Sequence, residues 1–233
     1  MYRFSIALNA QNDKTYGIQN IELTDGCFGA PLWELDGNRL EDIRNDLILN
    51  MRRIVLYSTD LPVSEYEHYI LFFRKAHLLN IENVHLTYAA MDGADDDSIR
   101  KIIALGEAFS IRIVFLYEYA HLDAFGVERY AALRSENTGL IFDTCEFVPK
   151  RINAYRQMLH TYRYRNDVLF LRVHDVLFDT LEPKLPLHGN SEIKDAASGL
   201  LARGFKGYFS FIPYGNFPMQ DIIQAFCALL CNM

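Results

Sequence analysis

The chain has 233 residues, half of them hydrophobic and 23% charged, which is enough to bury the core of one barrel-sized domain. The net charge of −7 argues against a nucleic acid as partner, because proteins that bind the phosphate backbone usually carry a basic face. No apolar run approaches about 18 residues and the first residues lack the pattern of a signal peptide, so we expect a cytoplasmic protein without a membrane segment.

Short apolar segments alternate with amphipathic stretches along the whole chain. Rich in Ile, Val, Leu, Phe and Tyr, they are expected to form strands over residues 3–8, 20–24, 53–58, 83–89, 111–118, 139–143, 168–174 and 207–212. Such alternation favours the α/β class and a (β/α)8 TIM barrel, as one domain over residues 1–233, with an open doubly wound sheet as second choice. The connection over residues 10–19 is too short for a full crossover helix.

Local signals mark where several helices begin and end. Residues 38–41 and 64–67 each have the spacing of a capping box, with Asn or Ser three residues before Glu. Pro149 suits a first helical turn. Gly204 follows an apolar helical pattern and suits a C-terminal cap of a helix that runs to about residue 203.

Two carboxylates are the most informative residues of the chain. Glu118 and Asp143 each end a continuously apolar segment, which is typical of a parallel strand whose C-terminal end opens into a pocket. Two acids at one barrel mouth can hold a divalent cation or serve as base and acid on a neutral polyol.

The order of these features resembles the xylose isomerase-like TIM barrels, a group that contains sugar phosphate isomerases and epimerases and related apurinic-site endonucleases. The segments that carry the resemblance are residues 16–23 (YGIQNIEL), 116–118 (LYE), 142–146 (FDTCE), 173–176 (VHDV) and 204–211 (GFKGYFSF). The resemblance spans nearly the whole chain and implies the barrel fold, an isomerase or epimerase activity, and a sugar or sugar phosphate as substrate.

The resemblance also implies a divalent metal held by Glu, Asp, His and Glu from four strand ends. Glu118 and Asp143 match the first two positions, but Arg172 stands in place of the histidine and Ile212 in place of the last glutamate. A guanidinium has no lone pair to donate and isoleucine has no donor atom, so the usual site cannot form. A further histidine of the family pattern is replaced by Glu146.

The residues themselves leave two arrangements open. Glu118, Asp143 and Glu146 suit an all-oxygen site for magnesium or manganese, with His174 as a possible nitrogen donor. Alternatively, Arg172 takes the place of the metal and neutralises Glu118 or Asp143 by a bidentate contact, so that its removal would cost about 3–5 kcal/mol. We favour the arginine by roughly two to one, because a buried arginine needs counter-charges. We therefore expect no stoichiometric zinc or manganese, and either no metal or a weakly bound divalent one.

Other residues have mainly structural interpretations. His188 begins the stretch HGNS, which resembles the family's loop before the last helix, where N–H groups can meet a phosphate or a sugar hydroxyl. Asn190 or Ser191 is alternatively a helix cap. His85 is interpreted as a core histidine, and Glu22 as a residue that holds neighbouring loops. The four cysteines lack a zinc-ribbon spacing and are interpreted as reduced thiols: Cys27, Cys145, Cys227 and Cys231.

Three functions from different classes follow. The first is a sugar or sugar phosphate isomerase or epimerase in which Glu118 removes a proton next to a carbonyl, while Asp143, Glu146 or an adapted metal stabilises the enediolate. The second is a barrel without catalysis that binds carbohydrate or a partner, and the least favoured is an apurinic-site endonuclease, which needs a histidine-rich cluster and a basic face. We expect no nucleic-acid or membrane partner, and the oligomeric state stays open. The residues expected to bind substrate are Arg172, His174, His188 and Glu146.

Overall fold

The computed structural model describes residues 2–9, 13–117, 127–160 and 162–232. Its parallel strands form a closed barrel in the order β1-β10-β7-β6-β5-β4-β3-β2. These strands are β1 (Arg3–Ala7), β2 (Asn20–Thr24), β3 (Arg53–Thr59), β4 (Asn83–Leu86), β5 (Arg112–Tyr117), β6 (Thr138–Phe142), β7 (Val168–Val173) and β10 (Tyr208–Phe211). The predicted (β/α)8 barrel is confirmed, and closure rules out the open doubly wound sheet.

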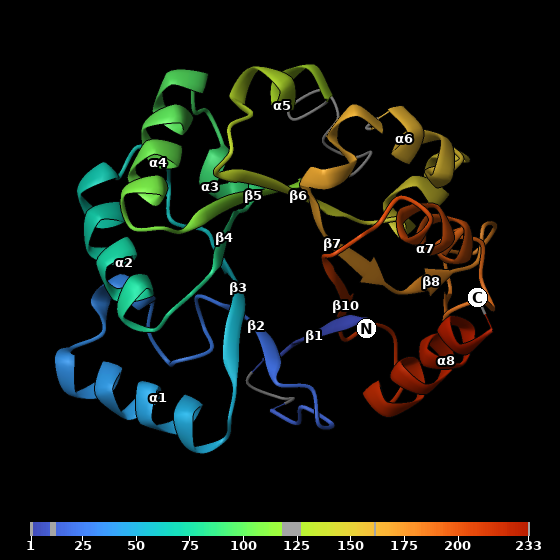
Figure 1. Ribbon diagram of the computed structural model, residues 1–233, viewed down its shortest axis with the longest axis horizontal. Coiled ribbons are helices and arrows are strands. Elements are labelled where there is room, and N and C mark those ends of the chain that lie inside the picture. The colour runs from blue at the N-terminus through green and yellow to red at the C-terminus, as the bar shows by residue number, and fades with distance from the viewer. Residues whose placement is uncertain (1, 10–12, 118–126, 161, 233) are drawn as a thin grey trace. The chain divides into compact units, whose positions relative to one another are not determined.

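Helices alternate with these strands (Figure 1). The α-helices are α1 (Gly37–Leu49), α2 (Tyr66–Leu78), α3 (Tyr88–Met91), α4 (Asp96–Ala108), α5 (Val127–Leu133), α6 (Ala154–His160), α7 (Ile193–Leu201) and α8 (Met219–Cys231). The described residues also form short 3-10 helices, η1 (Leu32–Glu34), η3 (Cys145–Lys150) and η4 (Tyr162–Asp167). The sequence did not predict a small antiparallel pair, β8 (Asp175–Val176) with β9 (Pro183–Lys184). Within the described residues, no helix is long and apolar enough to cross a membrane.

Both capping-box predictions are wrong. Helix α1 is capped by Asp36, whose Oδ1 accepts from the backbone N–H of Arg39 at 2.8 Å, so Asn38 already lies inside the helix. Helix α2 begins after Glu65 with no side-chain cap, and Ser64 belongs to the preceding turn. Spacing alone could not separate these boxes from a start that lies one or two residues away.

The end of α7 is close to its prediction, whereas the start predicted at Pro149 is not. Pro149 lies near the end of η3, where a short 3-10 helix stops rather than begins. Helix α7 ends at Leu201, and Gly204 follows with a φ of +78°, a conformation that glycine adopts without strain. The N–H of Phe205 then donates to the carbonyl of Leu200 at 3.1 Å, which satisfies a carbonyl of the last turn.

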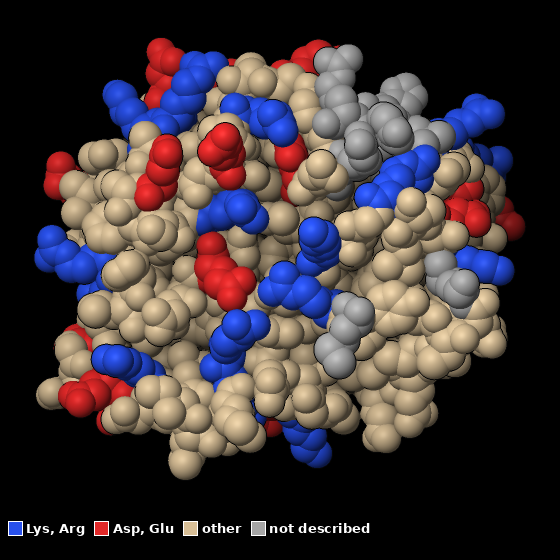
Figure 2. All heavy atoms as spheres, viewed as in Figure 1, with Lys and Arg blue, Asp and Glu red and all other residues tan. Residues whose placement is uncertain are grey.

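The described chain divides into two compact units. The N-terminal unit comprises residues 5–115 and 133–139, and the C-terminal unit comprises residues 1–4, 116–132 and 140–233. The assignment of one domain over residues 1–233 therefore stays a prediction. On the face in Figure 2, lysine and arginine side chains are interspersed with aspartate and glutamate.

In the N-terminal unit, Tyr57 of β3 packs against Phe72 of α2, with ring centroids 5.6 Å apart. His85 lies in β4, and its Nδ1 is 3.0 Å from the hydroxyl of Ser58 on the paired strand, in agreement with a core histidine. Glu22 is buried in β2 and accepts a 2.5 Å hydrogen bond from Ser5 of β1. Both residues therefore have structural partners, as the sequence suggested.

The C-terminal unit places β7 between β6 and β10. Phe170 pairs in register with Tyr208, and their rings stack with centroids 5.2 Å apart. Phe209 packs on the other side of the strand against Phe226 of α8, at 5.1 Å. The alternation along β7 and β10 therefore separates a helix-facing layer from a layer that faces the other way and includes Arg172.

Candidate functional site

The candidate site is formed where β6 and β7 end, within the C-terminal unit. Strand β6 ends at Phe142 and Asp143 follows at once, while β7 ends at Val173 and His174 follows. The two strands are parallel neighbours, so these two residues leave the sheet at the same edge. The first residue of η3, Cys145, lies two positions beyond Asp143.

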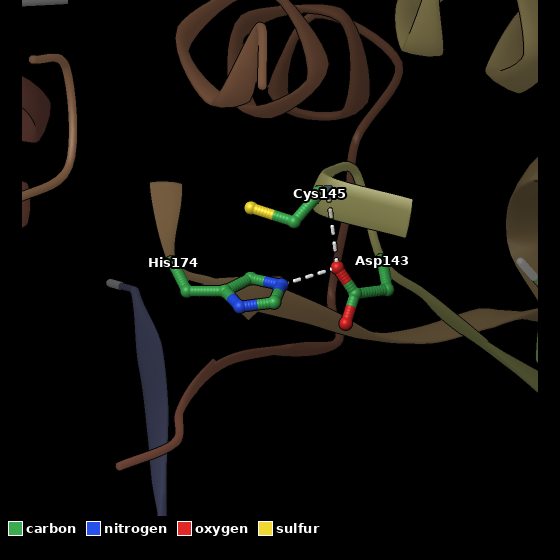
Figure 3. A group of neighbouring side chains, drawn as sticks. All are labelled: Asp143, Cys145 and His174. Carbon is green, nitrogen blue, oxygen red and sulfur yellow. Dashed lines mark hydrogen bonds and ion pairs between the residues drawn. The ribbon is translucent and has the colours of Figure 1, made fainter. Parts of the chain in front are cut away.

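Asp143 and His174 form a buried pair (Figure 3). Nε2 of His174 contacts Oδ1 of Asp143, and the side chains are only 12% and 8% exposed, respectively. The same carboxylate oxygen accepts from the backbone N–H of Cys145 at 3.1 Å. The histidine ring rests edge-on against Tyr214, with centroids 5.4 Å apart. The pair is thus held from both strand ends and shielded from water.

The surroundings of the pair favour opposite charges on its two members. Burial alone would raise the pKa of Asp143, but the charge and hydrogen bond of His174, the charge of Arg172 and the Cys145 N–H together lower it. Burial would likewise lower the pKa of His174, but the Asp143 carboxylate, assisted by Glu146, raises it. Both shifts favour the charged forms, an imidazolium and a carboxylate.

Arg172 lies on the same face of β7 as His174, as the two-residue alternation predicted. Its guanidinium donates to the hydroxyl of Ser210 at 2.5 Å, and Ser210 is its register partner on β10. Within the described residues the hydrogen-bond partners of Asp143 are His174 and Cys145, so Arg172 makes no bidentate contact with Asp143. The other expected partner of Arg172, Glu118, lies outside the described residues, and that contact stays a prediction. The long side chain of Arg172 reaches Ser210 on the neighbouring strand β10. His174, which follows the end of β7, contacts the carboxylate of Asp143 instead.

The other predicted site residues are distributed unevenly. Glu118 lies outside the described residues. Glu146 is half-buried in η3, where its negative charge acts on His174. His188 is exposed in the loop that follows β9. Ile212 follows β10 directly and is half-buried, so an apolar side chain stands at this strand end.

The loop around His188 does not offer the anion site that the resemblance implied. The carboxylate of Asp175 accepts backbone N–H groups from four residues, at 2.9–3.0 Å, and is 1% exposed. The four donors are Val176, Leu187, Gly189 and Ser191. The loop amides therefore bind an internal carboxylate where a phosphate was expected.

The alternative interpretation of this stretch as a helix cap is wrong as well. The N-cap of α7 is Glu192, in the left-handed region with a φ of 58°. Asn190 accepts from the N–H of Phe178 at 2.7 Å, and the hydroxyl of Ser191 donates to the carbonyl of His174 at 3.3 Å. Because Asp175 follows His174 directly, this loop fixes the backbone on which the site histidine stands.

Sequence reasoning missed two residues at this site, Asp175 and Cys145. The donor atoms of Asp143, Cys145 and His174 all lie within 4.8 Å of one another and all three residues are largely buried. A signal was present, since a cysteine two residues after a strand-end aspartate projects from the same turn. It carried little weight because a lone cysteine with no spaced partner usually is a packed thiol.

The residues present do not fit the four-ligand metal that the resemblance implies. Arg172 adds a fixed positive charge at one ligand position, and Ile212 offers no donor at another.

Comparison with known proteins gives matches in structure alone. No family model matches the chain, and no curated protein sequence matches it. A xylose isomerase domain protein from Planctomyces limnophilus superposes with a TM-score of 0.73 at 9% identity, covering 99% of this chain and 96% of the other. A D-tagatose 3-epimerase-like protein gives 0.71 at 12% identity, covering 98% and 96%.

A third solved structure, an IolI protein described with a bound zinc atom, gives a TM-score of 0.71 at 11% identity, covering 93% of this chain and 90% of the other. At such identities the likeness establishes the fold. The structural neighbours of this chain are xylose isomerase-like TIM barrel proteins, as the sequence resemblance predicted.

Proposed function

We propose that this protein is a sugar or sugar phosphate isomerase or epimerase that moves a proton next to a carbonyl without the resident metal ion of its structural neighbours. The observation that carries the proposal is the buried imidazolium–carboxylate pair of His174 and Asp143 at the C-terminal ends of β6 and β7. Active sites of this barrel fold lie at that end of the strands. Arg172, on the adjacent strand position of the same face, adds a second cation.

Two cations can take over the electrostatic role of a divalent ion. Removal of a proton next to a carbonyl places negative charge on the carbonyl oxygen, and preorganised donors with positive charge stabilise that oxygen. Nε2 of His174 is held by Asp143, and within the described residues Nδ1 has no acceptor. As an imidazolium, His174 is therefore able to donate from Nδ1 to a substrate oxygen.

The remaining roles follow from position. Asp143 fixes the orientation of the imidazole and keeps it protonated, so it is a positioning residue rather than the base. Glu118, expected from the sequence at the end of β5, is assigned the base that removes the proton. Glu146, half-buried beside His174, is assigned a hydrogen bond to a sugar hydroxyl, and Arg172 a contact with the carbonyl oxygen or a phosphate.

The substrate class rests on the comparisons and on charge. A D-tagatose 3-epimerase-like protein covers nearly the full length of the fold. The net charge of −7 does not favour a nucleic acid. Sugars and sugar phosphates are neutral or compact anionic ligands, which suit a site that offers two cations and two carboxylates.

Isotope exchange tests the proposal. Protein stripped of metal with a chelator is incubated in heavy water with a panel of ketoses, aldoses and their phosphates, and deuterium incorporation is followed by NMR. We expect incorporation next to the carbonyl, and a drop of about 100-fold or more in His174→Gln, because the electrophile is lost. His68→Gln, an exposed histidine of the N-terminal unit, is the matched control and should retain full exchange.

The second candidate is a carbohydrate-binding barrel without catalysis. The observation in its favour is the pair Arg172 and Ile212 at two positions where the resemblance expects metal ligands. Saturable sugar binding without deuterium exchange would favour this candidate over the isomerase. Absence of both binding and exchange over the whole panel would reject both.

A further inference from the structure

We propose that Asp143, Cys145 and His174 form a zinc site that accepts one Zn²⁺ in exchange for two protons. Its ligand set differs from the one that the resemblance implies, with which it shares only Asp143. Its other ligands, Cys145 and His174, stand at positions to which the resemblance gives no metal ligand. Binding of the ion does not depend on the function proposed above, whereas its effect on turnover does.

The geometry is close to what a zinc ion needs. The three donor atoms lie within 4.8 Å of one another, on side chains that are buried (Figure 3). Zinc bonds of about 2.0–2.3 Å in a tetrahedral site place the donor atoms about 3.3–3.7 Å apart. For the ion to enter, the imidazole and the carboxylate must move apart from their present contact, while the thiol already lies within 4.8 Å of both.

The backbone around the three ligands is fixed independently. Asp143 and Cys145 belong to one turn, in which the Cys145 N–H donates to the carboxylate. The carbonyl of His174 accepts from Ser191, and the next residue, Asp175, is held by four amides. A rigid frame lowers the entropy lost when the ion binds.

The donor set selects the metal. One sulfur, one imidazole nitrogen and one carboxylate oxygen suit zinc, while magnesium and calcium require oxygen ligands. Three protein ligands leave a fourth position for water or another small donor, as in zinc sites that are not purely structural. The set therefore differs from the all-oxygen magnesium or manganese site expected from the sequence.

The nearby positive charge of Arg172 does not disfavour zinc, because the net charge of the three ligands and the ion equals that of the three side chains without metal. Without metal, the imidazolium carries +1, the carboxylate −1 and the Cys145 thiol no charge, so the cluster is neutral. With Zn²⁺, the imidazole is neutral and the thiolate and carboxylate carry −1 each, so the cluster is neutral again. One proton leaves the His174 imidazolium and one leaves the Cys145 thiol. Arg172 therefore faces the same net charge in both states.

Zinc at this position would stop the proposed proton transfer. It would occupy Nε2 of His174 and the carboxylate of Asp143, and the histidine would no longer be an imidazolium. Stoichiometric zinc is therefore expected to inhibit deuterium exchange, and a chelator to restore it. This consequence rests on the proposed function, so it is tested apart from binding.

Cobalt substitution tests binding directly. Metal-free protein is titrated with Co²⁺, which takes zinc sites and gives a sulfur-to-cobalt charge-transfer absorption when a thiolate is bound. We expect one Co²⁺ per chain, the charge-transfer band, and its loss when Zn²⁺ is added. Cys145→Ser should abolish the band and weaken zinc binding by about tenfold or more. Cys27→Ser is the matched control and should keep the band.

Two further measurements make the outcome decisive. A Cys227→Ser/Cys231→Ser double variant must keep the band, since these two thiols four residues apart on α8 are the competing thiolate source. X-ray absorption of the unaltered zinc-loaded protein must show one sulfur in the coordination shell, which needs no variant to fold. A zinc shell of oxygen and nitrogen only, or a band unaffected by Cys145→Ser, overturns the proposal. Absence of deuterium exchange in the metal-free protein, together with an intact band after Co²⁺ is added, would reject the proposed function alone.

Discussion

Two carboxyl groups that follow strand ends, one in each unit, have different partners. Asp143 follows β6 in the C-terminal unit and pairs with an imidazolium, while Asp25 follows β2 in the N-terminal unit and has no cation among its hydrogen-bond partners. Oδ2 of Asp25 accepts from the hydroxyl of Thr59 at 2.9 Å and the N–H of Asp60 at 2.8 Å. Within the described residues its buried Oδ1 has no partner.

The two carboxyl groups consequently titrate in opposite directions. Burial raises the pKa of Asp25, and the hydrogen bonds from Asp60 and Thr59 do not offset it. Burial acts on Asp143 in the same sense, but His174 and Arg172 outweigh it and the pKa falls. A buried carboxylate thus stays ionised where the fold supplies a counter-charge, and this is why we place the chemistry in the C-terminal unit.

A third carboxyl group, Asp175, is buried with four backbone N–H groups as its hydrogen-bond donors. Asp175→Ala leaves the N–H groups of the loop without an acceptor, so we expect the free energy of unfolding to fall by about 3–5 kcal/mol, the largest loss of this set. Urea denaturation at pH 7 measures it. The control Asp179→Ala removes an exposed carboxylate and should cost less than about 0.5 kcal/mol.

Gly189→Ala attacks the same contact from the other side. A Cβ at this position would lie 2.3 Å from Oδ1 of Asp175 and 2.6 Å from the carbonyl oxygen of Val176, so the loop has to move. If Asp175→Ala and Gly189→Ala each lower the free energy of unfolding by less than about 1 kcal/mol, water can replace the hydrogen bonds between Asp175 and the loop N–H groups at little cost.

Removal of His174 should make Asp143 resemble Asp25. In His174→Ala the carboxylate keeps the Cys145 N–H and the nearby charge of Arg172 but loses its direct partner, so its pKa should rise. We expect a loss of about 2–3 kcal/mol at pH 7 in urea denaturation, less than a fully uncompensated charge would cost. His68→Ala serves as control. If the pKa of Asp143 measured by NMR is the same in His174→Ala as in the parent, the contrast drawn between Asp143 and Asp25 is wrong.

Arg172→Ala should have a smaller effect than the sequence suggested. Arg172 donates to the hydroxyl of Ser210, and its charge lowers the pKa of Asp143 without a hydrogen bond between the two side chains. We expect a loss of about 1–2 kcal/mol, instead of the about 3–5 kcal/mol of a direct counter-ion. Arg172→Lys keeps the charge and should recover part of it. If Arg172→Ala lowers the free energy of unfolding more than His174→Ala does, Arg172 rather than His174 is the more important cation for the stability of this site.

The strands were predictable because a parallel strand buried on both faces is a continuous apolar run, as in residues 113–117. Strands β8 and β9 were not, since two residues carry no periodicity. Alternation placed Arg172 and His174 on one face, but which of them reaches Asp143 depends on side-chain length and strand register. The N–H groups that bind Asp175 come from residues up to 16 positions away along the chain. The role of Cys145 depends on His174, which follows another strand. Such contacts exist only in three dimensions.

The last and smallest effect concerns the pH dependence of stability, and it tests the other half of the comparison. The pKa of Asp25 is raised in the folded protein, so folding favours its protonated form. Its contribution is fully present below the ordinary aspartate pKa of about 3.9 and is lost as pH rises through the raised folded value. Asp25→Asn removes this titration, so the variant should gain stability relative to the parent as pH increases from about 4 to 7. Urea denaturation at several pH values, with the exposed Asp42→Asn as control, gives the slope. A parent that gains stability over Asp25→Asn across this range would show that Asp25 is stabilised as a carboxylate, like Asp143, and the contrast between the two strand ends would be lost.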